Sequence, residues 1–198
     1  MEVAVYLFTG FLEAGKTKFI EETMRDPNFN DPSHKYLIIT CEEGEEQLDP
    51  SEMASNISFA SFDDVQRITP DRLSAMQKRA GADIVVVEYN GMWTLDNFYN
   101  ALPQSWMVYQ EIFIVDSTTA ITYNANMRQL FVDKLTSCEM VVFNRVGEKT
   151  DKMALHKIVR GVSRKANICY EDLAGDVEFD EIEDPLPYDL NASVIEIK

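Results

Sequence analysis

The chain has 198 residues, 45% of them hydrophobic, and a formal net charge of −16. This length suffices for a substantial buried core and suits one domain better than two. The acidic excess repels polyanions, so we expect neither nucleic acid nor an anionic membrane as a partner. An acidic second residue and a short first apolar run argue against a signal peptide or a membrane span, and predict a cytoplasmic protein.

Five apolar runs are predicted strands. They are continuous rather than alternating, which is typical of strands that are covered on both faces of a parallel sheet. In chain order they occupy residues 3–8, 36–40, 84–88, 111–116 and 140–144.

Three segments between these runs are predicted helices. Residues 16–25 follow the first run, and residues 70–81 begin with a proline and end on a glycine, as helices often do. Residues 117–135 begin with Ser and Thr, which can cap a helix. Alternating strands and helices predict an α/β fold, with a mostly parallel central sheet and helices on both faces. Ligands of such folds bind at the carboxyl ends of the strands.

The chemistry changes after residue 170. Residues 171–189 contain nine acidic residues and no Lys or Arg, so we expect a solvated, irregular segment. The sequence therefore predicts one folded α/β domain over residues 1–170, to which the next motif assigns nucleotide binding, and an acidic tail or linker over residues 171–198. The last residues, "NASVIEIK", are strand-like, and we expect them either to pair with the sheet or to begin a further domain.

A phosphate-binding motif follows the first predicted strand. Gly10, Gly15, Lys16 and Thr17 satisfy the pattern G-x-x-x-x-G-K-[ST] between a strand and a helix, which is the context of a P-loop NTPase. Backbone N–H groups of residues 11–16 would surround phosphates, Lys16 would reach their outer oxygens, and Thr17 would bind Mg²⁺.

The strand at residues 84–88 supplies a matching acidic group. Glu88 ends this run and could hold the metal or its water, and Gly91 could offer its N–H to a γ-phosphate. Such a carboxylate beside a phosphate loop is typical of a nucleotide hydrolase.

Together these motifs resemble the CobW/HypB/UreG family of P-loop GTPases, most closely its CobW-like branch. The loop "TGFLEAGKTK" is similar to the branch's T-G-F-L-G-A-G-K-T-T, and "CEEGEEQLD" at residues 41–49 is similar to N-E-F-G-E-x-G-x-D. "EYNG", "IVDS" and "KANICYEDLAG" match later motifs in the same order.

The resemblance implies GTP or GDP and Mg²⁺ as cofactors, a protein client or activator as partner, and a link to metal delivery or cofactor assembly; a homodimer stays open. It implies catalytic roles for Lys16, Glu88 and Asp49, and Mg²⁺ ligation by Thr17, Glu88 and Asp49. The implied nucleotide-binding residues are Gly10, Glu13, Ala14, Gly15, Lys16, Thr17, Lys18, Gly91, Asn144 and Arg145.

Three departures from the family pattern qualify these expectations. Residues 57–69 contain no cysteine where the family carries C-x-C-C, so we expect no tight zinc site. The guanine-reading N-K-x-D is Asn144, Arg145, Val146 and Gly147, which predicts weak discrimination between guanine and adenine unless Glu148 substitutes. Glu13 replaces a loop glycine, either pointing outward or weakening phosphate binding by repulsion.

The leading hypothesis is a Mg²⁺-dependent GTPase with slow turnover that couples the γ-phosphate to residues 41–52. One alternative is a nucleotide-gated interaction module with little catalysis, and another is a P-loop kinase for a small molecule.

Cysteines and histidines are assigned no catalytic role. The spacing of Cys41, Cys138 and Cys169 fits buried thiols better than a disulfide framework. His34 and His156 are interpreted as surface residues.

Overall fold

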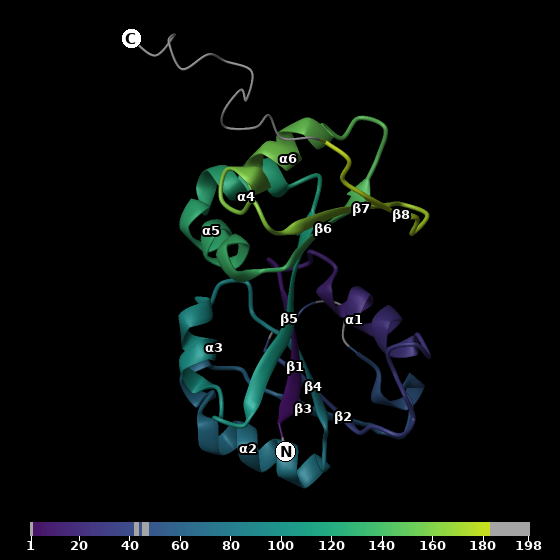
Figure 1. Ribbon diagram of the computed structural model, residues 1–198, viewed down its shortest axis with the longest axis vertical. Coiled ribbons are helices and arrows are strands. Elements are labelled where there is room, and N and C mark those ends of the chain that lie inside the picture. Colours follow the sequence, from purple (N-terminus) through teal and green to yellow (C-terminus); the bar gives the residue numbers. More distant parts are fainter. Residues whose placement is uncertain (1, 42–43, 45–47, 183–198) are drawn as a thin grey trace, which may run out of the picture.

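The computed structural model describes residues 2–41, 44 and 48–182. Eight strands form one sheet in the order β3-β2-β4-β1-β5-β6-β7-β8. Neighbouring strands run parallel, except that β8 is antiparallel to β7 (Figure 1). The strands are β1 (Val3–Thr9), β2 (Tyr36–Thr40), β3 (Ile57–Ser61), β4 (Ile84–Glu88), β5 (Trp106–Asp116), β6 (Met140–Val146), β7 (Asn167–Asp172) and β8 (Val177–Phe179).

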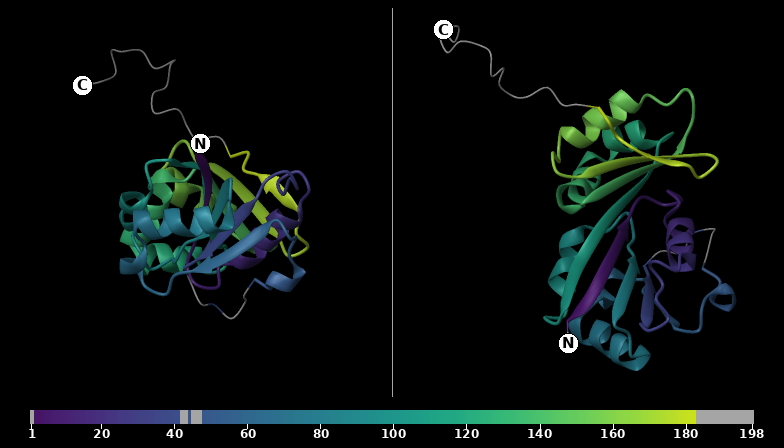
Figure 2. Two further views of the ribbon diagram at one scale, coloured as in Figure 1. Left: turned by 90° about the horizontal axis from the view of Figure 1, so that it is seen from below. Right: turned by 45° about the vertical axis from the view of Figure 1, so that its right-hand side comes forward.

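Helices cover both faces of the sheet. The α-helices are α1 (Lys16–Arg25), α2 (Pro70–Ala80), α3 (Leu95–Ala101), α4 (Ala120–Asn126), α5 (Arg128–Ser137) and α6 (Lys152–Arg160), with short 3₁₀ turns η1 (Pro50–Glu52) and η2 (Val65–Arg67). Helix α1 lies on one face, while α3, α4 and α5 lie on the other (Figures 1 and 2). One apolar cluster lies under α2 and α3, a second lies under α4, α5 and α6, and a third lies under α1.

The predicted α/β fold and its five strands are confirmed. The central strands are almost wholly buried, because helices cover them on both sides. Helix α2 begins at Pro70, is capped by the Thr69 side chain, which accepts from the N–H of Arg72, and ends at Gly81 with φ 63°. Only glycine adopts this left-handed conformation without steric cost, so Gly81 ends the helix.

The single helix predicted over residues 117–135 is wrong in one respect, since the structure has two helices there. Helices α4 and α5 are separated at Met127, whose φ and ψ are −126° and 41°. The interruption follows Asn124 and Asn126, which have low helix propensity because their side chains compete for backbone groups. The predicted Ser/Thr cap is also missing, because Thr119 precedes α4 but makes no side-chain capping bond.

The irregular conformation predicted from residue 171 is wrong for the first part of that segment. Strand β7 continues to Asp172, and β8 pairs with it through Tyr170↔Glu178 and Glu171↔Val177. His156, expected at the surface, is 2% exposed, and its Nδ1 lies 2.6 Å from Asp180 Oδ2. This buried contact holds the segment against α6. Residues 183–198, including "NASVIEIK", lie outside the described residues, so the domain boundary stays a prediction.

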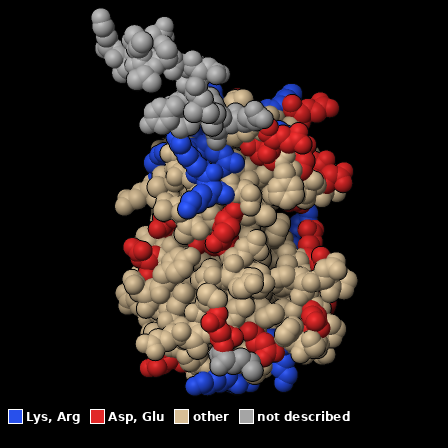
Figure 3. All heavy atoms as spheres, viewed as in Figure 1, with Lys and Arg blue, Asp and Glu red and all other residues tan. Residues whose placement is uncertain are grey.

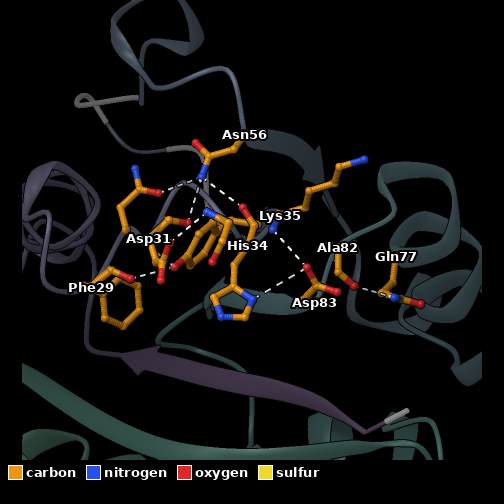
Figure 4. Close-up of polar contacts among 11 residues, drawn as sticks. Phe29, Asp31, His34, Lys35, Asn56, Gln77, Ala82 and Asp83 are labelled. Carbon is orange, nitrogen blue, oxygen red and sulfur yellow. Dashed lines mark hydrogen bonds and ion pairs between the residues drawn. The ribbon is translucent and has the colours of Figure 1, made fainter.

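Side chains close the loops at the amino ends of β2, β3 and β4 (Figure 4). Asn56 Nδ2 donates to Asn30 Oδ1 at 2.9 Å and to the His34 carbonyl at 3.1 Å. The Lys35 N–H donates to Asp83 Oδ2 at 3.1 Å, and Gln77 donates to the carbonyl of Ala82. These contacts satisfy backbone groups that the strands leave unpaired.

Within the described part of the chain, no helix is both long and apolar enough to cross a lipid bilayer.

Candidate functional site

The predicted phosphate loop connects β1 to α1 at the carboxyl end of the sheet. Gly10 has φ 155° and Gly15 has φ 92°, so two glycines take backbone conformations that are costly for other residues. Glu13 also has a positive φ of 57°. The family pattern has glycine at this position, and the left-handed backbone is a physical reason for it. The Glu13 side chain is exposed, and its effect on phosphate binding stays a prediction.

Close backbone packing leaves no room for side chains at two glycines. A Cβ on Gly10 would lie 2.5 Å from the carbonyl oxygen of Ile114. A Cβ on Gly91 would lie 2.3 Å from the carbonyl oxygen of Gly10 and 2.7 Å from Phe11 Cα. Gly91 therefore packs directly against the phosphate loop, and its predicted N–H bond to a γ-phosphate stays a prediction.

Lys16 and Thr17 are the first residues of α1, so both lie at its positive N-terminal end. Lys16 is 2% exposed, and its Nζ donates to the carbonyls of Gly10 at 3.0 Å and Phe11 at 2.9 Å. These bonds hold the ammonium group inside the curve of the loop. A phosphate there would meet both the ammonium and the N–H groups that begin the helix.

Thr17 and Glu88 lie together, as the sequence predicted for a Mg²⁺ site. Thr17 Oγ1 donates to Glu88 Oε1 at 2.7 Å, and Glu88 is 5% exposed at the end of β4. Mg²⁺ in nucleotide sites commonly takes one or two protein oxygens and completes its shell with water and phosphate. A threonine hydroxyl and a carboxylate beside a phosphate loop fit this requirement.

Asp49 has a different local role. It is exposed, it precedes η1, and its Oδ1 accepts from the N–H of Ser51 at 2.8 Å and from its hydroxyl at 2.7 Å. The bonds from Ser51 hold the pKa of Asp49 below its usual value. Of the predicted switch segment 41–52, residues 42–43 and 45–47 lie outside the described residues. The role of Asp49 toward metal or water stays a prediction.

Asn144 and Arg145 lie at the end of β6, where the nucleotide base is expected. Their side chains donate hydrogen bonds to carbonyls of the phosphate loop. Asn144 Nδ2 donates to the Ala14 carbonyl at 2.6 Å, and Arg145 Nη1 donates to the Glu13 carbonyl at 3.0 Å. Arg145 also pairs with Asp116 at 2.5 Å. Burial raises the pKa of Asp116, but bonds from Thr118 and the pairing with Arg145 together lower it below its usual value. The two predicted base-side residues thus also shape the phosphate loop.

A small cavity of about 200 Å³ lies between the start of α1 and the ends of β6 and β7. Asn144 is 8% exposed, and its Oδ1 is buried without a hydrogen-bond partner. Sequence reasoning missed Glu171, which the structure places at this cavity. Its only signal was its position at the end of the apolar run "NICYE". Residues lining the cavity are Gly15, Lys18, Phe19, Glu22, Asn144, Arg145, Glu171, Asp172 and Leu173.

The three cysteines are free and buried, which confirms the interpretation of Cys41, Cys138 and Cys169 as buried thiols. Over the ranges that the structure describes, no three or more His, Cys, Asp or Glu residues form a cluster able to hold a metal ion. The absence of a tight zinc site stays a prediction.

The family described as CobW/HypB/UreG, nucleotide-binding domain, matches residues 4–170 of the chain. Among solved structures, the Zn(II)-bound YjiA GTPase from E. coli is 20% identical with a TM-score of 0.61, and the match covers 85% of this chain and 57% of that chain. The hydrogenase maturation factor HypB from Archaeoglobus fulgidus is 14% identical with a TM-score of 0.56, and the match covers 87% of this chain and 82% of that chain.

FlhF, solved with GMPPNP and Mg²⁺, is 13% identical with a TM-score of 0.55, covering 91% of this chain and 71% of that one. At these identities the structures show a shared P-loop NTPase fold. The match to YjiA spans little more than half of that protein's length. No curated protein matches the chain.

Proposed function

Because the chain belongs to the CobW/HypB/UreG family of nucleotide-binding domains, we propose that it is a Mg²⁺-dependent GTP-binding protein that hydrolyses GTP slowly. The observation that carries this proposal is the hydrogen bond from Thr17 to Glu88 at 2.7 Å, beside the buried ammonium of Lys16. A hydroxyl and a carboxylate that could hold a metal thus lie close to a cation that could bind phosphate, which supports the proposal.

In this proposal each residue has one task. The loop N–H groups and Lys16 bind the β- and γ-phosphates, Thr17 and Glu88 hold Mg²⁺ or its water, and Gly91 lies against the loop where the γ-phosphate would end. Bound Mg²⁺ supplies positive charge that offsets the charge developing on the phosphate oxygens.

Slow turnover follows from the charges near the loop. Arg145, a cation beside the loop, pairs with Asp116 and donates to a loop carbonyl, which commits it to holding the loop. A partner that adds a cation at the γ-phosphate would raise the rate. We therefore propose a protein client or activator as partner. A role in metal delivery or cofactor assembly is part of this proposal, supported by the family alone.

A nucleotide-gated interaction module with little catalysis is the second candidate. The conformation of Asp49 favours it, because the hydrogen bonds from Ser51 compete with any role of that carboxylate in orienting water.

One experiment on the whole chain separates the two. GTP is titrated calorimetrically with and without Mg²⁺, and phosphate release is followed under the same conditions. Mg²⁺-dependent binding with slow phosphate release supports the GTPase, whereas binding without phosphate release supports the module. No binding of GTP or GDP in either condition would overturn both candidates.

A further inference from the structure

We propose that the Glu171 carboxylate reads the guanine base, in place of the aspartate that this chain lacks at Gly147. This inference rests on the proposed function, and it names the residue that would set the base specificity of the same site.

The first evidence is the face of the sheet on which Glu171 lies. Side chains alternate along a strand, so Glu171 shares a face with Cys169. Cys169 packs in the apolar cluster that contains Ile20 and Met24 of α1. Glu171 therefore faces α1, the helix that begins at the phosphate loop.

Asn144 lies on the same face and on the neighbouring strand. The regular pairing of β6 with β7 runs to Phe143↔Tyr170, and Asn144 and Glu171 are the next residue of each strand. Val142, two residues before Asn144, packs in the same cluster under α1 as Cys169. The register of the two strands shifts after Phe143, and the amide of Asn144 and the carboxylate of Glu171 both line one cavity there.

The cavity is lined by hydrogen-bond acceptors of Asn144 and Glu171, to which the N–H groups of a base could donate. Asn144 Oδ1 is buried there without a partner. The pKa of Glu171 is raised above its usual value, mainly by burial. The charges of Lys18 and Arg145 lower this pKa, and those of Glu22 and Asp172 raise it. A carboxylate that has lost water in this way is stabilised by a ligand that brings N–H donors.

Glu148, the substitute suggested by the sequence, lines a different hollow from Glu171. It lines a neighbouring hollow of about 500 Å³ together with Lys152 and Tyr170, and this hollow shares Asp172 and Leu173 with the cavity beside Asn144. Tyr170 packs in the cluster under α4, α5 and α6, which is the opposite face of β7 from Glu171. Glu148 itself therefore lies outside the lining of the cavity beside Asn144.

Asp172 is a weaker candidate, although it lines the cavity. Its Oδ1 accepts from the N–H groups of Ala174 at 2.7 Å and Asp176 at 3.0 Å. These bonds form the turn between β7 and β8, so its carboxylate is already engaged.

The chemistry of the bases predicts a specific pattern. Guanine presents two adjacent donors, N1–H and the 2-amino group, which a carboxylate accepts together. At the same edge adenine presents the N1 acceptor and a C2–H, so a carboxylate placed for guanine N1–H and the 2-amino group does not favour it. Xanthine carries a carbonyl at C2, which a carboxylate repels, but a glutamine can accept from N1–H and donate to that carbonyl.

The test is a calorimetric titration of the full chain and of its Glu171→Gln variant with GDP, ADP and XDP, each with Mg²⁺. We expect the unmodified chain to prefer GDP. We expect the substitution to lower GDP affinity about tenfold to hundredfold, which is the value of a charged hydrogen bond. XDP affinity should rise, and ADP affinity should stay unchanged.

Glu148→Gln is the matched control and should change none of the three affinities. A thermal unfolding curve for each variant shows that the fold is kept. Unchanged GDP affinity in Glu171→Gln, or an equal loss for all three nucleotides, would overturn the assignment of Glu171 while leaving the proposed function in place. Failure of the unmodified chain to bind any of the three would overturn the proposed function, and this inference with it.

Discussion

At the carboxyl ends of the strands, the phosphate loop takes positive φ at Glu13 and Gly15 and leaves a buried atom of Asn144 without a partner. At the amino ends of β2, β3 and β4, Asn56 and Asp83 instead satisfy the loops with hydrogen bonds (Figure 4). Both ends belong to the same sheet and carry loops between the same kinds of elements.

The difference separates groups held ready for a ligand from groups that stabilise the fold. A backbone in a strained conformation and an unpaired polar atom both cost free energy, and such features persist where function requires them. Substitutions at the carboxyl end should therefore change binding more than stability, and substitutions at the amino end the reverse.

The largest expected effect is on nucleotide binding in Lys16→Ala. We expect at least about a hundredfold loss of GTP affinity, because in the proposed function the ammonium makes charged hydrogen bonds to phosphate. The free energy of unfolding should change by at most about 2 kcal/mol. Calorimetry measures the GTP affinity, and urea unfolding measures the free energy of unfolding. Lys157→Ala, at an exposed position of α6, is the control. Unchanged affinity would remove the phosphate-binding assignment.

Glu88→Gln should separate turnover from binding. We expect phosphate release to fall about tenfold to hundredfold while GTP affinity stays within about threefold, since in the proposed function the carboxylate acts on metal or water. Glu21→Gln on α1, which loses only an exposed pairing with Arg25, is the control. If affinity and turnover fall equally, Glu88 is a structural carboxylate.

Between the two ends, Glu111 on β5 gives stability a pH dependence. Its side chain accepts from Tyr99 at 2.5 Å and from Ser137 at 3.0 Å, and burial raises its pKa to about 7 from 4.5. Between these values the folded state keeps a proton that the unfolded state has lost, so stability falls as pH rises through this window.

The expected loss between pH 4.5 and 7 is up to about 3 kcal/mol. Glu111→Gln removes this contribution, so its stability relative to the unmodified chain should increase from pH 5 to pH 8. Urea unfolding at several pH values measures the difference. A difference that does not vary with pH would show that Glu111 ionises normally.

The smallest expected effect is at the amino end. Asn56→Ala should lower the free energy of unfolding by about 1–2 kcal/mol, because it leaves the acceptors on Asn30 and His34 unpaired. GTP affinity should stay unchanged. Asn97→Ala on α3, whose exposed side chain bonds only to Thr94 among the described contacts, should cost under about 0.5 kcal/mol. Weakened GTP binding in Asn56→Ala would show that the two ends are coupled.

Acidic side chains gather over the β7–β8 end of the molecule in the view of Figure 3. The sequence showed that this charge exists but not that it lies on an ordered strand. Strand β8 forms because Asp180 meets His156 and Tyr170, which come from α6 and β7. Contacts between such distant residues leave no periodic pattern in the sequence.

The sequence by itself determined the central strands, the phosphate loop and the residues at the loop's two ends, because these depend on local patterns: continuous apolar runs, two glycines at a set spacing and a carboxylate at a strand end. Only the tertiary structure decided that Glu171 shares a cavity with Asn144 while Glu148 lines a neighbouring hollow. Strand pairing and the face on which each side chain lies set these distances, and both arise only when the sheet has formed.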